Sequence, residues 1–191
     1  QLQKVVRMDL NQEYIDHAYM ELRINRIYDE LNEENKFKMD KNHLHIWPRG
    51  SHMLIALPNI DGSFTSTLFA PWKIVEDLDT DEKVLDFFWR DFPDVFEKGL
   101  MTKEDILKAF HENPRGSLIC IKCSPYHFED KCIIIGDAAH SMVPFYGQGM
   151  NCGFEDVRIL MELLEKRDFN DLKGSFDEYT ETRHKDLTAI I

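Results

Sequence analysis

The sequence has no long hydrophobic run, few cysteines and a shortage of basic residues. No stretch of about 18 apolar residues occurs, so no segment is predicted to cross a bilayer as a helix. Its 23 lysines and arginines stand against 35 aspartates and glutamates, and the net charge of −12 argues against nucleic acid or an anionic membrane surface as a partner. The four cysteines lack the spacing of a disulfide framework, which favours a reducing compartment.

What is present suits a globular protein. The 191 residues are enough for one or two domains, and a hydrophobic content of 43% is enough for a core. The chain begins Gln-Leu-Gln-Lys, with neither a Met nor a signal peptide, so we expect it to be part of a longer protein.

One group of residues has a spacing close to that of a zinc knuckle. Cys120, Cys123, His127 and Cys132 follow the pattern C-x2-C-x3-H-x4-C. However, residues 118–123 have the composition of a strand, and a knuckle would be rich in glycine and basic residues. We therefore predict no metal site.

The first two thirds of the chain predict a sheet with helices. Strands are expected where β-branched and bulky apolar residues lie between turn residues. The three central strands, joined by short turns, predict an antiparallel meander. A charged segment that faces the solvent and is partly helical is expected at residues 26–41. The expected strands are residues 14–24, 43–48, 52–58, 63–71 and 117–124.

Besides a helix that ends at Lys166, three helices are expected. One begins near Thr80 and ends before Pro93, and another begins with a pattern typical of a capping box at Thr102 and ends before Pro114. The polar segment 169–191 is expected to form the last helix.

The stretch from residue 132 to residue 156 predicts a strand, a tight turn, a loop and a helix. Ile133–Ile135 is a short β-branched run, as expected for a strand buried on both faces, and Gly136 ends it. Proline and glycines delay the next helix until about Asn151, and that helix continues to Lys166. Its apolar residues share one helical face: Phe154, Val157, Leu160, Met161 and Leu164.

This arrangement is suited to a particular kind of ligand. The start of a helix presents free backbone N–H groups and a positive dipole end, which favour an anion or an electron-rich carbonyl. Asp137 follows the strand and can accept hydrogen bonds from hydroxyl groups. A ligand with a polyol chain and a carbonyl-bearing ring would satisfy both, and a flavin is such a ligand.

Two blocks of the sequence resemble a known family. Gly-Asp-Ala-Ala-His at residues 136–140, followed by Pro-x-x-Gly-Gln-Gly-Met-Asn at residues 144–151, is similar to the second flavin motif of the FAD-dependent aromatic hydroxylases. Residues 19–22, 44–49 and 53–59 resemble the substrate domain of a member that acts on an aromatic amino acid. The resemblance implies a monooxygenase in which NADPH reduces FAD and a flavin C4a-hydroperoxide hydroxylates the ring.

The resemblance also implies which residues form the site. No side chain is expected to be catalytic, since the cofactor performs the difficult step. Each group has an alternative interpretation: Asp137 could be an ordinary turn aspartate, the glycine-rich residues an ordinary loop, and the apolar residues part of a core. His140 is expected to make a structural hydrogen bond, and His45 and Trp47 to belong to the core. The expected cofactor-binding residues are Gly136, Asp137, Pro144, Gly147, Gly149, Met150 and Asn151. The expected substrate-binding residues are Leu44, Met53, Ile55, Phe69, Pro144, Phe145 and Gln148.

The predicted fold class is therefore α+β joined to α/β. An antiparallel substrate-domain sheet with helices is expected at residues 1–125, and the part of a Rossmann-like FAD domain that contacts the flavin ring at residues 126–191. No G-x-G-x-x-G occurs, so an N-terminal segment of the same protein is expected to bind the ADP half of FAD.

The resemblance further places the complete protein on the cytosolic face of the mitochondrial outer membrane, anchored by a C-terminal segment outside this chain. Two other interpretations remain open: a related flavin hydroxylase with a different aromatic substrate, and a flavin-binding module without enzymatic activity.

Overall fold

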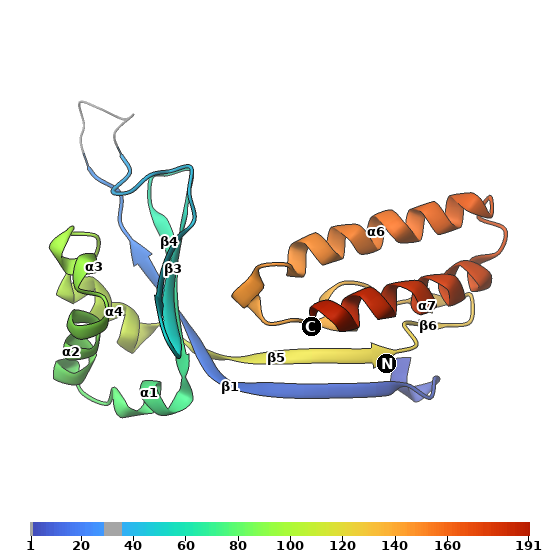
Figure 1. The fold of residues 1–191 in the computed structure, drawn as a ribbon, viewed down its shortest axis with the longest axis horizontal. Helices are drawn as coiled ribbons and strands as arrows, with labels where there is room; N and C mark the ends of the chain where they lie inside the picture. Colours follow the sequence, from blue (N-terminus) through green and yellow to red (C-terminus); the bar gives the residue numbers. More distant parts are fainter. Residues whose placement is uncertain (1, 29–35) are drawn as a thin grey trace. The chain divides into compact units, whose positions relative to one another are not determined.

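The computed structural model describes residues 2–28 and 36–191, which form two compact units (Figure 1). One unit comprises residues 16–117, and the other comprises residues 1–15 and 118–191. The strands β1 (Asp9–Ile24) and β5 (Arg115–Ser124) each run through both units. The units differ from the predicted domains, which had their boundary at residue 125 and placed residues 1–15 in the first domain.

A five-stranded sheet with the order β2-β3-β4-β1-β5 organises the chain. The pairs β2·β3, β3·β4 and β1·β4 are antiparallel, which confirms the predicted meander. The first strand begins at Asp9, before the predicted start at Tyr14, because sheet pairing also recruits a polar segment of low strand propensity. The meander strands are β2 (His45–Arg49), β3 (His52–Pro58) and β4 (Phe64–Pro71).

One face of the meander forms the core of the unit 16–117. Register places Leu68 directly opposite both Met20 and Leu54, and all three are almost fully buried. Their cluster includes buried residues of α2, α3 and α4, which lie together on one side of β3 and β4 in Figure 1. The helices of this unit are α1 (Trp72–Asp77), α2 (Asp81–Asp91), α3 (Pro93–Glu97) and α4 (Lys103–Glu112).

The two predicted helix starts in this unit are confirmed. The Thr80 side chain accepts a hydrogen bond from the N–H of Lys83, and Thr102 and Asp105 form a complete capping box. Residues 26–28 and 36–41 contain no helix, and the remainder of the predicted excursion lies outside the described residues.

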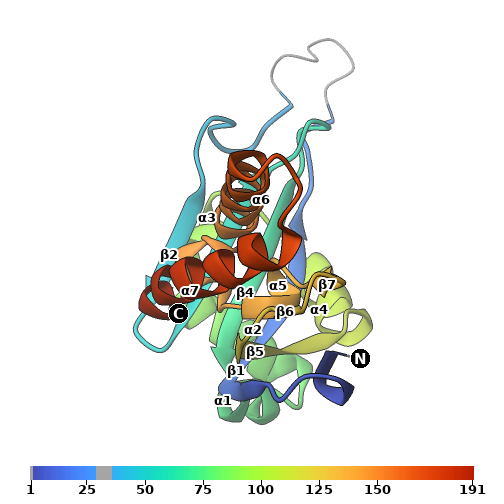
Figure 2. The same cartoon turned by 90° about the vertical axis from the view of Figure 1, so that its right-hand side faces the viewer.

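The other unit contains a β-hairpin and two long helices that lie side by side in Figures 1 and 2. Tyr126, Tyr179 and Leu187 are almost fully buried in its core. Besides its parts of β1 and β5 and two 3₁₀ turns, at Leu2–Lys4 and Pro144–Tyr146, this unit contains β6 (His127–Phe128), β7 (Cys132–Ile133), α5 (Asp137–His140), α6 (Gly149–Lys166) and α7 (Leu172–Ile190).

The prediction of a strand buried on both faces at residues 133–135 is wrong for the structure described here. Strand β7 has only two residues, and Ile133, Ile134 and Ile135 are half-buried. Its pairing partner is β6, in a sheet of two strands, whereas burial of both faces requires a larger sheet covered on each side. The described chain is thus a mixed α+β structure with a five-stranded sheet. None of its described helices is long and apolar enough to span a membrane.

We expect Phe88→Ala to lower the free energy of unfolding by about 3–5 kcal/mol, because it opens a cavity where Phe88 packs between Phe87 and Phe92. Urea unfolding measures the change. The control is Asp86→Asn on the exposed side of the same helix, which should stay within about 0.5 kcal/mol. Equal effects of the two substitutions would contradict the proposed core.

Candidate functional site

A hollow of about 510 Å³ lies between α5 and the start of α6, and we call it the glycine-lined hollow. Four glycines line it, so backbone forms much of its wall. A Cβ added at Gly136, Gly147 or Gly153 would meet no heavy atom within 4 Å, which shows that the space beside each is open. The lining residues are Gly136, Asp137, Met142, Val143, Pro144, Gly147, Gly149, Met150 and Gly153.

The predicted cofactor-binding residues come together at this hollow. All of them except Asn151 line it, and Asn151 is on the first turn of α6, where its side chain donates a hydrogen bond to Gln148 Oε1 at 3.0 Å. The carboxylate of Asp137 is exposed. The structure thus groups these residues, while their role toward a cofactor stays a prediction.

The start of α6 contributes electrostatics to the hollow. Gln148 is the N-cap residue of α6, and the first hydrogen bond along this helix runs from the N–H of Cys152 to the carbonyl of Gln148, at 2.9 Å. The N–H groups of Gly149, Met150 and Asn151 come before this bond, and the geometry of a helix gives them no acceptor within it. They carry the positive end of the helix dipole. Because Gly149 and Met150 line the hollow, this positive end opens onto it.

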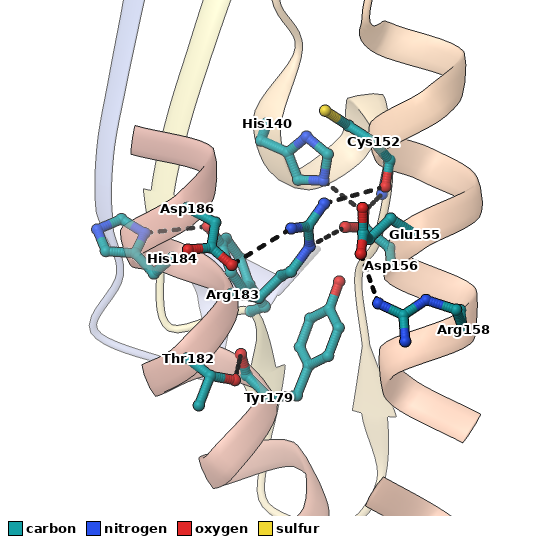
Figure 3. Close-up of polar contacts among 12 residues, drawn as sticks. His140, Cys152, Glu155, Asp156, Arg158, Tyr179, Thr182, Arg183, His184 and Asp186 are labelled. Carbon is teal, nitrogen blue, oxygen red and sulfur yellow. Dashed lines mark hydrogen bonds and ion pairs between the residues drawn. The ribbon is translucent and has the colours of Figure 1, made fainter. Parts of the chain in front are cut away.

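A buried ionic network lies beneath the turn that begins the site (Figure 3). Asp156 on α6 is fully buried, and its Oδ2 accepts hydrogen bonds from the N–H of Gly136 at 2.9 Å and from His140 Nε2 at 2.5 Å. Its Oδ1 accepts from Arg183 Nε at 2.8 Å, and Arg183 also donates to the carbonyl of Cys152 at 3.3 Å. The network connects α5, α6 and α7.

The charges of this network stabilise one another. Burial by itself would raise the pKa of Asp156, but the hydrogen bonds from His140, Gly136 and Arg183 outweigh it and hold that pKa below its usual value. Burial would lower the pKa of Arg183, and the hydrogen bond to Asp156 raises it. Burial and the negative charge of Asp156 raise the pKa of Tyr179, so its hydroxyl stays protonated.

The prediction that His140 makes a structural hydrogen bond is confirmed. It is 2% exposed and holds Asp156. No role was predicted for Asp156 or Arg183 from the sequence. The sequence does indicate that Asp156 is buried, because its spacing puts it on the same helical face as Cys152, Ile159 and Leu163, and these three residues pack in the core.

The predicted substrate-binding residues of the meander share the face opposite the core. Register places Met53 directly opposite Phe69, and Ile55 has its side chain on the same face as Met53. We call Met53, Ile55 and Phe69 the second sheet face. Leu44 comes just before β2 and is half exposed.

The other predicted substrate-binding residues lie near the glycine-lined hollow. Pro144 lines it, Phe145 lies in the same 3₁₀ turn as Pro144 and is 43% exposed, and Gln148 donates to the carbonyl of Tyr146 at 3.4 Å. These residues belong to the unit that contains α6, whereas the second sheet face belongs to the other.

The remaining predictions concern core and metal-ligating residues. Trp47 packs against the core cluster and donates to Asp94, and His45 makes an edge contact with Phe64. His127, from the zinc-knuckle pattern, is hydrogen-bonded to Thr180 and Asp177. Within residues 2–28 and 36–191, no group of three or more potential ligands is placed to hold a metal ion.

We expect Asp156→Asn to lower the free energy of unfolding at pH 7 by about 3–5 kcal/mol, because it leaves the buried charge of Arg183 with only the longer contact, 3.7 Å, to the exposed Asp186. Since the folded-state pKa of Asp156 is depressed, its stabilisation is present above the ordinary value of 3.8 and is lost as the pH falls through the folded-state pKa. The difference between the two proteins should therefore shrink below about pH 4.

Urea unfolding at a series of pH values measures this difference. Glu155→Gln is the control, because Glu155 pairs with Arg158 on the exposed side of α6 and should contribute at most about 1 kcal/mol. A difference that stays constant down to pH 2 would mean that the Asp156 carboxylate does not stabilise the fold.

Comparison with known proteins identifies the family. The chain is 53% identical to the kynurenine 3-monooxygenase of Candida albicans and 50% identical to that of Saccharomyces cerevisiae, with 99% and 100% of this chain aligned. It spans about 40% of the length of these curated relatives. The solved structure of 2-methyl-3-hydroxypyridine-5-carboxylic acid oxygenase shares its fold, with a TM-score of 0.61 and 17% identity over 90% of this chain and 43% of that one. Residues 76–191 match the family described as FAD binding domain, and the chain therefore belongs to that family.

Proposed function

We propose that the complete protein is an NADPH-dependent flavoprotein monooxygenase that hydroxylates L-kynurenine to 3-hydroxykynurenine. The observation that carries this proposal is the glycine-lined hollow, in which Asp137 and the start of α6 meet. The chain that forms it is about half identical to enzymes named kynurenine 3-monooxygenase.

The hollow fits the flavin end of FAD. The Asp137 carboxylate can accept hydrogen bonds from the hydroxyls of a ribityl chain, and glycine backbone lets a flat ring approach closely. The N–H groups that begin α6 can donate to a pyrimidine carbonyl and stabilise negative charge on the ring. Gly136, Pro144, Gly147, Gly149, Met150 and Asn151 would hold the ring together with Asp137.

The chemistry and the binding are divided between the cofactor and the chain. Bound FAD, once reduced by NADPH, supplies the activation of O2. The residues of this chain orient the substrate ring, exclude water and stabilise charge, so no side chain needs to act as a nucleophile.

The second sheet face supports the proposed substrate site. Met53 and Ile55 lie outside the core cluster, which uses the opposite face, so core packing does not explain their apolar character. Met53 and Ile55 are half-buried and Phe69 is 4% exposed, and an apolar face of this kind is suited to an aromatic ring. We propose Leu44, Met53, Ile55 and Phe69 as the substrate-binding residues of the unit 16–117, and Pro144, Phe145 and Gln148 as those of the unit that contains α6.

The surface of α6 supports a further part of the proposal. Its predicted apolar stripe is largely exposed: Phe154 is 69% exposed, Val157 47% and Met161 41%. The opposite side of α6 packs against α7, so the helix has two apolar faces and only one is covered by described residues. We propose that an N-terminal FAD-binding segment covers the stripe, completes a Rossmann-like domain around β7 and binds the ADP half of FAD.

The proposal also includes a cellular setting. Kynurenine hydroxylation belongs to the kynurenine pathway, which leads to pyridine nucleotide biosynthesis. The complete protein would act at the cytosolic face of the mitochondrial outer membrane, held there by a segment outside this chain.

For the complete protein, we expect NADPH oxidation that depends on L-kynurenine and yields 3-hydroxykynurenine. Asp137→Ala should raise the dissociation constant of FAD by about 10- to 100-fold, since a hydrogen bond to a charged group contributes about 1.5–3 kcal/mol. Flavin fluorescence titration measures the affinity, and product analysis measures the turnover.

The control for this experiment is Asp130→Ala, which removes an exposed carboxylate in the β6–β7 turn. Normal flavin affinity in Asp137→Ala would show that the assignment of the hollow is wrong. Faster coupled hydroxylation of another aromatic acid would indicate a related hydroxylase, and NADPH oxidation that no aromatic acid stimulates would indicate a flavin-binding module.

Phe154→Asp tests the proposed cover of α6. In the complete protein it should lower the free energy of unfolding by about 3 kcal/mol or more, because burial of a phenylalanine contributes roughly 1.5–3 kcal/mol and the new carboxylate adds a desolvation cost. In this chain alone the same change should stay within about 0.5 kcal/mol, since the side chain is exposed. Equal losses in the two proteins would exclude a covering segment.

A further inference from the structure

We infer that Asp156 is the positioning residue of the flavin site and that Arg183, on the last helix, sets the affinity of the site for FAD by holding Asp156. The inference rests on the proposed function, because it concerns how the hollow is kept in a shape that binds flavin. Neither side chain is among the described residues that line the hollow, so both act through other residues.

The first step is the position of the two groups that Asp156 Oδ2 holds. The N–H of Gly136 immediately precedes α5, and His140 is the last residue of that helix. A single carboxylate oxygen therefore fixes both ends of a four-residue helix. Asp137, the proposed acceptor for the ribityl hydroxyls, is the first residue between these two ends.

The second step is that this turn requires external support. Gly136 has φ +59° and ψ −147°, a region that residues with a Cβ rarely adopt. Glycine adopts this region about as readily as the ordinary ones, so the intrinsic backbone preference of Gly136 does not fix the turn and surrounding contacts must select it. The carbonyl of Gly136 is held by the N–H groups of Ala139 and His140, and its own N–H is held by Asp156. Loss of the Asp156 contact would let the turn relax and move Asp137.

The third step is the dependence of Asp156 on Arg183. Both side chains are almost fully buried, and Arg183 Nε donates to the carboxylate oxygen that Gly136 and His140 do not use. Arg183 comes from α7 and Asp156 from α6, and Figure 3 shows the two side chains pointing toward each other. Without the guanidinium, the carboxylate loses its counter-ion and its fixed orientation. A helix outside the hollow thereby controls the turn.

Arg183→Met in the complete protein tests the inference. We expect the dissociation constant of FAD to rise at least 10-fold, and the visible circular dichroism of the bound flavin to change, because Asp137 would no longer be fixed. Arg183→Lys keeps the charge and should restore the FAD affinity to within about threefold of the original protein. At saturating FAD, the KM for L-kynurenine should remain within about twofold, because Arg183 does not contact the substrate.

Two further variants keep the test decisive. Arg158→Met is the matched control, since Arg158 also pairs with carboxylates, Glu155 and Glu162, but lies exposed on α6. If Arg183→Met does not fold, His140→Phe replaces it: this change removes one hydrogen bond at Asp156 Oδ2 and leaves the pair with Arg183 in place. It too should raise the dissociation constant of FAD at least 10-fold.

The outcomes separate this inference from the proposed function. Normal FAD affinity in folded Arg183→Met, or in His140→Phe where that variant is used, would overturn the inference. If Asp137→Ala weakens FAD binding while Arg183→Met and His140→Phe do not, the inference fails and the proposed function stands. If Asp137→Ala also binds FAD normally, the proposed function fails with it.

Discussion

The geometry of the candidate site depends on one buried carboxylate. The carboxylate of Asp156 is removed from water and its burial would be costly without partners, yet three donors satisfy it: Gly136 and His140 at the two ends of α5, and Arg183 on α7. Its position fixes the turn at Gly136, and that turn places Asp137 at the glycine-lined hollow. The ion pair with Arg183 also connects α6 to α7. Stability and site geometry therefore rest on the same contacts, and a change in either partner is expected to affect both.

The meander shows how one sheet serves two purposes. Alternation along β3 and β4 directs Leu54 and Leu68 to the helices and Met53 and Phe69 to the other face. A shift of one residue in register would exchange the two sets. The buried face fixes the register, because its side chains interlock with those of α2, α3 and α4. The second sheet face is thereby positioned without having to contribute to the core itself.

Some predictions from the sequence were right because their causes are local. The caps at Thr80 and Thr102 follow from hydrogen bonds within a few residues, and the short turns that join the three meander strands follow from glycines, Gly50 and Gly62, with positive φ. The strand at Ile133–Ile135 was wrong because a β-branched run indicates burial without specifying its neighbours. The apolar stripe of α6 was found, but the sequence could not show that α7 covers the opposite side.

By itself, the sequence determined the composition of the site: a carboxylate after a strand, a glycine-rich loop and the start of a helix, in an order that resembles one family. The tertiary structure decided how these parts are held. Asp156 and Arg183 are 27 residues apart in the sequence and lie on different helices, so no local pattern relates them. The two side chains pair because α6 and α7 pack side by side. The packing excludes water, and this strengthens the attraction between the carboxylate and the guanidinium enough to fix the turn.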